Sequence, residues 1–340
     1  MQLAGYELIE IIGQGGMGVV YKARQVSMDR VVAVKILTPK LAADKAFTSR
    51  FLREARATAK LNHPNIVSGI DVGESGGLYY FAMEFVEGET ALKKLLRDGP
   101  LPLALIERIA LDVAQALKHA ESQGLVHRDV KPENIMISKE NLCKLLDLGL
   151  AQELQTEGGR SSESGRAIGS PKYISPEQAR GQELVDIRAD VYCFGATLYH
   201  LITGEALFRG TSQELLLGHV GGVATNPLDL RRDLPSGWAF VLEKMLAKAP
   251  ADRYATITAL LDDFRRVIVG RSPVAALEQP VVSSIENTHG VLERLEIPYA
   301  AGMRTLAVQS VQRLWWAWLV LGGLAALGGL AAVAYLVLAK

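Results

Sequence analysis

The chain is poor in cysteine, has no excess of charge of either sign, and shows no N-terminal leader. Its two cysteines, Cys143 and Cys193, are flanked by apolar residues, which predicts two buried, reduced thiols in place of a disulfide or metal site. Lys plus Arg and Asp plus Glu both number 37, and this balance argues against a nucleic-acid binder that works by bulk electrostatics. The opening MQLAGYELIE lacks the basic and apolar regions of a signal peptide.

A long uncharged run lies near the C-terminus. Residues 314–339 include no charged side chain, and a helix of that length reaches about 39 Å, against a hydrocarbon core of roughly 30 Å. A buried core helix is the alternative, but core helices are rarely apolar on every face. Arg304 and Arg313 precede the run and Lys340 follows it, which favours a single-pass helix in the cell membrane with residues 1–313 in the cytoplasm.

Hydrophobic patterns divide the rest of the chain into two parts. Short β-rich runs fill most of residues 1–86, interrupted by one helical pattern in DKAFTSRFLREARATAKLN. Helical patterns dominate residues 87–270 and are strongest at 101–124, 187–203, 211–219, 237–248 and 255–268. Residues 271–313 show weak periodicity and are predicted to be a juxtamembrane linker. A cleft between the sheet-rich and helical parts is a natural ligand site.

A glycine-rich segment, IGQGGMGVV, lies between two of the predicted strands. Glycines allow a tight turn to bring backbone N–H groups close to phosphates, although a simple hairpin or a dinucleotide fold shares this spacing. A dinucleotide site needs a helix directly after the glycines, whereas VVYKARQ is typical of a strand. The residues of this candidate phosphate site are Ile12, Gly13, Gln14, Gly15, Gly16, Met17, Gly18, Val19 and Val20.

A second polar segment, VHRDVKPENIMI, is bounded by apolar ends and fits either a surface loop or a catalytic site. Lys35 is the charged residue within the apolar run VVAVKIL, and Glu54 lies in the helical pattern that follows. By themselves, Lys35 and Glu54 would pass as solvated surface residues.

Taken in order, these motifs resemble those of the protein kinase family, and their amino-acid sequences resemble those of its bacterial serine/threonine group. The ordered set is GQGGMGVV, VAVK, Glu54 in a helix, HRDVKPEN, DLG, SPE, the aspartate of RADVYCFG and the arginine of PADRY. The resemblance implies an α+β, bilobal protein-kinase fold with a small β-rich N-lobe (residues 1–86) and a larger α-helical C-lobe (87–270). One C-terminal transmembrane helix (314–339) completes the expected architecture.

The resemblance also implies a division of roles in transfer of the ATP γ-phosphate to Ser or Thr hydroxyls of proteins. Asp129 would orient the hydroxyl and accept its proton, and Lys131 would touch the transferred phosphate. Lys35, aligned by Glu54, would bind the ATP phosphates. Asn134 and Asp147 would hold Mg²⁺, or Mn²⁺ in its place, because hard cations prefer oxygen ligands.

The resemblance also implies which residues form the adenine pocket, although these residues could equally be ordinary residues of the hydrophobic core. Its expected members are Ile12, Val20, Ala33, Met83 and Met136 by side chain, and Glu84 and Val86 by backbone. Among structural residues, Asp190 would brace the HRD turn, Glu177 would pair with Arg253, and Ser170 would contact the catalytic aspartate. Three positions depart from the family: Leu148 replaces Phe, Ser175 replaces Ala, and Cys193 replaces the more frequent Ser.

Two other functions compete with an active protein kinase. A catalytically dead pseudokinase serving as a membrane scaffold is disfavoured because none of the phosphate or metal ligands is missing. A small-molecule kinase is disfavoured by SPE and by the substrate-binding stretch GSPKY. Expected partners are protein substrates, membrane lipid and a second copy of the chain, since Gly322 and Ala326 have the small-xxx-small spacing of paired helices. Arg128 before Asp129 indicates control by phosphorylation at Ser161, Ser162 or Ser164.

Overall fold

The computed structural model describes residues 3–147, 171–182, 184–277 and 284–286, which belong to one compact unit, Met1–Thr288. Within these ranges, no helix combines the length and apolar character needed to cross a bilayer. The predicted membrane helix, the loop serines, Leu148 and Ser170 all lie outside the described residues, so those predictions remain predictions.

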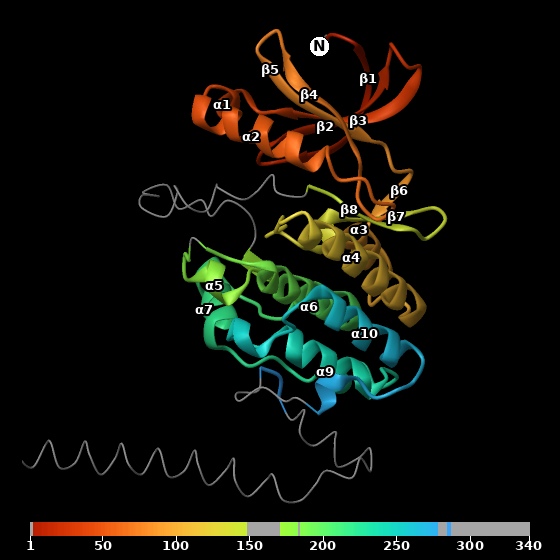
Figure 1. The fold of residues 1–340 in the computed structure, drawn as a ribbon, viewed down its shortest axis with the longest axis vertical. Helices are drawn as coiled ribbons and strands as arrows, with labels where there is room; N and C mark the ends of the chain where they lie inside the picture. The colour runs from red at the N-terminus through yellow and green to blue at the C-terminus, as the bar shows by residue number, and fades with distance from the viewer. Residues whose placement is uncertain (1–2, 148–170, 183, 278–283, 287–340) are drawn as a thin grey trace, which may run out of the picture. The chain divides into compact units, whose positions relative to one another are not determined.

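The N-terminal part is a five-stranded antiparallel sheet in the order β1-β2-β3-β5-β4, with two helices beside it (Figure 1). Its elements are β1 (Tyr6–Gly15), β2 (Gly18–Gln25), β3 (Arg30–Leu37), α1 (Pro39–Ala42), α2 (Lys45–Thr58), β4 (Gly69–Ser75) and β5 (Leu78–Glu84). The predicted strands and the predicted helix, α2, are therefore confirmed, whereas the short helix α1 was not predicted.

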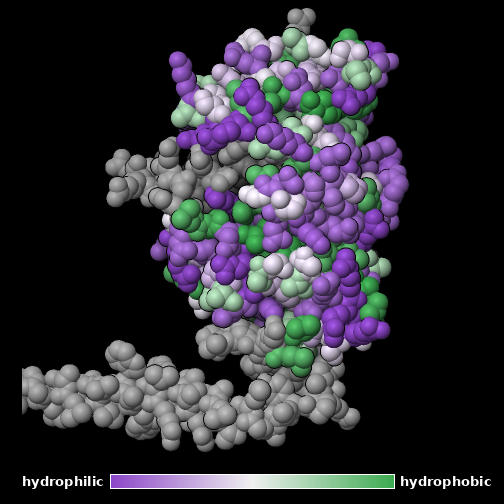
Figure 2. All heavy atoms as spheres, viewed as in Figure 1, coloured by the Kyte–Doolittle hydropathy of each residue, from purple (hydrophilic) through white to green (hydrophobic). Residues whose placement is uncertain are grey.

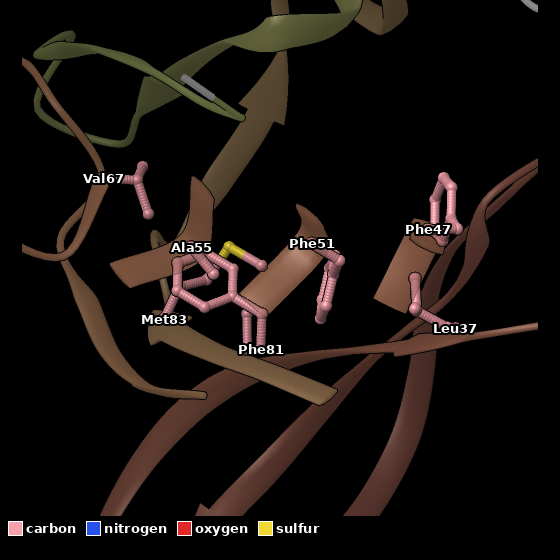
Figure 3. Close-up of a cluster of buried hydrophobic side chains, with 8 residues drawn as sticks. Leu37, Phe47, Phe51, Ala55, Val67, Phe81 and Met83 are labelled. Carbon is pink, nitrogen blue, oxygen red and sulfur yellow. The ribbon is translucent and has the colours of Figure 1, made fainter. Parts of the chain in front are cut away.

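Side-chain alternation along β3 explains why the sheet is covered on both faces. Val32, Val34 and Ile36 point to one face, where they pack with Leu3, Tyr6, Ala23, Tyr80 and Ala82. Ala33 and Leu37 point to the other face and pack against α2. Figure 3 shows Phe51 and Ala55 of that helix lying over Phe81 and Met83 of β5. Lys35 shares the α2 face because it is two residues from both Ala33 and Leu37.

The C-terminal part is mainly helical, as predicted, and carries a small three-stranded sheet (Figure 1). The sheet consists of β6 (Gly88–Thr90), β7 (Ile135–Ser138) and β8 (Cys143–Leu145). The helices are α3 (Ala91–Asp98), α4 (Leu103–Ser122), α5 (Pro176–Ala179), α6 (Ile187–Thr203), α7 (Ser212–Gly221), α8 (Pro227–Leu230), α9 (Ser236–Met245) and α10 (Ile257–Ile268). The described residues of this part also include the 3-10 turns η1 (Pro132–Asn134), η3 (Pro171–Tyr173), η4 (Pro250–Asp252) and η5 (Val274–Ala276).

Helix α6 lies at the centre of the helical part, with nearly all of its side chains buried. Phe194 of this helix packs edge-on against Phe264, which in turn contacts Trp238 at a ring-centroid distance of 5.6 Å. On the face shown in Figure 2, hydrophilic residues cover most of the described surface and apolar residues are scattered. The largest apolar side chains are buried in the core around α6.

The chain continues to pack on the C-lobe after α10, within the range predicted as a linker. The backbone N–H groups of Val274 and Ala275 donate to the Asp263 carboxylate at 2.6 and 2.9 Å. Further on, Ile285 is buried and lies in a parallel bridge with Ala224. This part of the range is held by backbone hydrogen bonds, which a search for hydrophobic periodicity does not detect.

Both thiols are free and buried, as predicted. Burial, followed by the nearby Asp112 charge, raises the pKa of Cys143 to about 12. Burial also raises the pKa of Cys193 far above its usual value. The Cys193 Sγ lies 3.5 Å from the Gln178 side-chain oxygen, the weak contact expected when sulfur replaces a hydroxyl.

The predicted pair of Glu177 and Arg253 is confirmed and is completely enclosed. Two parallel hydrogen bonds of 2.7 and 2.8 Å join the guanidinium to the carboxylate, and the side chains are 0% and 5% exposed. The remaining donors of Arg253 reach the carbonyl oxygens of Ala247, Arg188 and Lys248. All five guanidinium N–H donors are therefore used.

Replacing Arg253 should destabilise the fold strongly. In Arg253→Met the Glu177 charge is left buried without a partner, so we expect the free energy of unfolding to fall by about 3–5 kcal/mol. Urea denaturation followed by tryptophan fluorescence measures this loss. The matched control is Arg265→Met, because Arg265 pairs with Asp262 on the surface at 3.0 Å with both side chains about 60% exposed and should contribute less than about 1 kcal/mol. Equal losses in the two variants would contradict the assignment.

Candidate active site

The segment between α4 and η1 is fixed by Asp190, a buried residue of α6. Its two carboxylate oxygens accept the backbone N–H groups of His127 and Arg128 at 2.7 and 2.6 Å. The predicted brace of the HRD turn is thus confirmed. Burial raises the pKa of Asp190 to about 6, while His127 and the two backbone N–H groups act in the opposite direction.

The same turn is held from other directions by groups that motif reading did not single out. The carbonyl of Arg128 accepts from the Gln178 side-chain amide at 2.9 Å, and that of Val130 accepts from the Thr197 hydroxyl at 3.0 Å. Arg128 has a φ of 65°, a conformation that costs a non-glycine residue energy and persists where surrounding contacts fix it. Gln178 and Thr197 were missed because neither belongs to a motif that the family resemblance supplied, whereas Asp190, which is equally distant in sequence, does.

His127 links this turn to the strand that ends at Leu145. Its Nδ1 accepts the backbone N–H of Asp129 at 3.2 Å, so the ring proton resides on Nε2, which lies 2.9 Å from the Leu146 carbonyl oxygen. The imidazole therefore ties the segment bearing Asp129 to the segment bearing Asp147.

Asp129, Lys131 and Asn134 form one hydrogen-bonded group. The Lys131 ammonium lies 2.6 Å from Asp129 Oδ2, and the Asn134 amide nitrogen donates to the same oxygen at 3.0 Å and to the Asp129 carbonyl at 2.8 Å. Because the amide nitrogen of Asn134 is occupied, its oxygen Oδ1 is the atom left to bind a cation. The structure thus brings together three of the predicted site residues.

Lys35 and Asp147 form the second group. The Lys35 ammonium lies 2.8 Å from Asp147 Oδ2, although β3 and the DLG segment are over a hundred residues apart. Burial pushes the pKa of Asp147 upward, but the charge and hydrogen bond of Lys35 outweigh it and hold that pKa below its usual value. The predicted Lys35–Glu54 contact is untested, because the Glu54 side chain is not among the described ones.

The glycine-rich segment forms the β1–β2 hairpin, as the strand-turn-strand pattern predicted. Gly18 approaches the Ile36 carbonyl so closely that a Cβ there would lie only 2.0 Å from it, which excludes other residues. At Gly15 and Gly16, by contrast, a Cβ would meet no atom within 4 Å. These two positions leave open space beside the backbone, as a phosphate cradle requires.

Four of the predicted adenine-pocket residues lie in one apolar cluster. Ala33 and Met83 are buried there, and Val20 and Val86 pack against them. Leu146 joins the same cluster and was missed, although its place directly before Asp147 could have indicated it. Ile12 and Met136 are outside this cluster: Ile12 is 45% exposed and Met136 is half-buried in β7. The backbone N–H of Glu84 donates to the Ser68 carbonyl oxygen, so the Glu84 carbonyl is its backbone group left for a hydrogen bond with adenine.

A hollow in the described part of the chain measures about 430 Å³ and is lined by Glu87, Gly88, Glu89, Lys94, Ile137, Ser138, Lys139 and Asn141. Its charged residues pair with one another, as in Lys139–Glu87 and Lys94–Glu89, and none of them is a predicted site residue.

Comparison with known proteins gives the family. Residues 6–264 match the protein kinase domain. The serine/threonine-protein kinase PknB of Mycolicibacterium smegmatis is 44% identical over 276 residues, covering 79% of this chain and 44% of that protein. The probable PknB of Bifidobacterium longum is 40% identical over 291 residues, covering 82% of this chain and 42% of that protein.

Among solved structures, the Mycobacterium tuberculosis PknI kinase domain is similar with a TM-score of 0.63 and 31% identity, over 77% of this chain and 95% of that one. The chain spans less than half the length of the curated relatives described above. It belongs to the protein kinase family, among the bacterial eukaryotic-like serine/threonine kinases.

Proposed function

We propose that the chain is an active serine/threonine protein kinase that transfers the γ-phosphate of ATP to Ser and Thr hydroxyls of proteins. The observation that carries this proposal is the convergence of Asp129, Lys131 and Asn134 in one hydrogen-bonded group, with Lys35 and Asp147 in another. His127 bonds to the backbone of both segments, so the two groups are linked.

The residues fit ATP and Mg²⁺. The donor set for the ion consists of the Asp147 carboxylate and the free amide oxygen of Asn134, both hard oxygen ligands. When bound, Mg²⁺ supplies positive charge that offsets the charge of the phosphates. Lys35 is placed to bind phosphate oxygens, and the open space at Gly15 and Gly16 permits close approach to the hairpin backbone.

Asp129 has the central role in the transfer. Its carboxylate would accept a hydrogen bond from the substrate hydroxyl, orient the oxygen toward the phosphorus and take up the proton as the bond forms. Lys131, already 2.6 Å from Asp129, would place a positive charge beside the phosphoryl group in transit. The pseudokinase alternative is not favoured, because each of these groups is present and in contact.

Asp129→Asn should reduce phosphoryl transfer by about 10²–10⁴-fold, since the amide cannot take up the proton. ATP affinity should change less than about threefold, because Asp129 is not assigned a nucleotide contact. The measurements are the initial rate of casein phosphorylation and the affinity for a fluorescent ATP analogue. Asp262→Asn, at a 60% exposed position, is the control. A rate near that of the control would contradict the role of Asp129.

Phosphorylation between Asp147 and Glu177 is a second part of the proposal. The sequence there is rich in Ser and Gly, and a phosphate on Ser161, Ser162 or Ser164 would add about 1.5–2 negative charges that Arg128 could bind. Autophosphorylation between two copies of the chain is the proposed source. In a variant with Ala at all three serines, we expect the rate to fall about tenfold, as one phosphate–arginine hydrogen bond of roughly 1.4 kcal/mol would give. Absence of phosphate by mass spectrometry, or an unchanged rate, would remove this mechanism.

Residues 314–339 are proposed to anchor the kinase in the cell membrane, with the kinase unit in the cytoplasm and lipid in contact with the span. The support is their length, their lack of charge and the arginines that precede them. The full chain should resist alkaline extraction from membranes, and Leu327→Arg, which puts a charge mid-span, should release it. Complete extraction of the unaltered chain would contradict anchoring.

A further inference from the structure

A buried polar cluster lies beneath the η3 turn, away from the groups assigned to phosphate, metal and adenine. It consists of Tyr192 on α6, His219 on α7 and Lys248 just after α9. Tyr192 and His219 are both 0% exposed, and the edge of the Phe208 ring closes over the imidazole at a centroid distance of 5.1 Å. Polar groups buried this deeply cost energy unless they serve a contact.

The hydrogen-bond directions in this cluster follow from the chemistry of lysine. The Lys248 ammonium can only donate; it lies 3.2 Å from the Gly218 carbonyl oxygen and 3.5 Å from the Tyr192 hydroxyl. The hydroxyl oxygen therefore accepts a hydrogen bond from Lys248, and its own hydrogen is directed to His219 Nδ1, 3.0 Å away. The ring proton of His219 must then be on Nε2.

That Nε2–H has no geometrically good acceptor among the described atoms, although it is buried. Burial and the Lys248 charge lower the pKa of His219 to about 4, so the ring is neutral at pH 7, while the backbone of Lys172 and Pro171 raises the pKa slightly. Helix α7, which bears His219, packs against the η3 turn, so a buried donor without an acceptor in the described part of the chain lies on a helix that contacts the turn.

The far end of the same turn is held by a second histidine. The Tyr173 hydroxyl lies 2.7 Å from Nδ1 of His200, and the two rings stack at 5.9 Å. The turn is therefore held by His200 at Tyr173 and packs against α7, the helix that bears His219. It belongs to the GSPKY stretch, which the family resemblance associates with the substrate.

We propose that His219 is a positioning residue for protein substrate: its Nε2–H, oriented through Tyr192 and Lys248, is the donor available to the backbone carbonyls of Pro171–Lys172 and sets the turn against which the substrate chain binds. This inference rests on the proposed kinase function. It predicts that His219 governs substrate affinity and not the chemistry at Asp129.

The test compares His219→Met with His219→Gln, because these side chains have nearly equal size and only glutamine keeps a donor at the position of Nε2. With casein as substrate, we expect the Met variant to raise the casein KM about three- to tenfold, the range expected for one hydrogen bond. Its kcat and its KM for ATP should stay within twofold of the unaltered chain. The Gln variant should recover most of the casein KM.

Amide hydrogen exchange of residues 171–175 provides a readout that does not need activity. Exchange should be faster in His219→Met than in His219→Gln. Tyr192→Phe, which removes one hydroxyl, should give an intermediate rate, and it replaces the Met variant in the test if that variant does not fold. Equal exchange and equal casein KM in all variants would overturn the proposal. A fall in kcat together with a rise in the KM values for both casein and ATP would also overturn it. Altered exchange in a chain that phosphorylates nothing would instead refute the kinase function and leave the positioning role intact.

Discussion

The carboxylate of Asp190 is the contact on which the rest of the active site depends. It lies inside the helical core, without exposed surface, and accepts the backbone N–H groups of His127 and Arg128. A backbone turn cannot be buried against apolar helices unless its polar groups are bonded. Asp190 supplies those bonds from the most buried helix, so the position of Asp129 is set by the core and not by a surface loop.

The supporting contacts extend this constraint in three directions. Thr197 and Gln178 bind the carbonyls of the same turn, and His127 joins the turn to Leu146. Gln178 lies in α5 beside Glu177, whose carboxylate is bound by Arg253. The polar groups around this turn therefore form a network of buried contacts, and the removal of one of them leaves a buried partner unbonded.

The sequence predicted most of the secondary structure and singled out residues that the structure brings together, for physical reasons. Helices α4 and α6 are long and strongly patterned, and the order of motifs placed Asp129, Asn134 and Asp147 on specific segments. It did not predict the Lys35–Asp147 ion pair, because a contact between distant segments leaves no local pattern and the family resemblance had assigned Lys35 to Glu54. Leu146 was passed over, although it directly precedes Asp147. The bridge of Ile285 to Ala224 was also not predicted, since it depends on backbone hydrogen bonds that leave no periodic pattern in the sequence.

The central claim is transfer of phosphate from ATP to serine or threonine, and analysis of the phosphorylated amino acids tests it most directly. The full chain is incubated with radiolabelled ATP, Mg²⁺ and casein, and the labelled protein is hydrolysed to its amino acids. The account predicts label in phosphoserine or phosphothreonine, and none when Mg²⁺ is chelated. Label confined to phosphotyrosine, or no incorporation at any Mg²⁺ concentration, would contradict it.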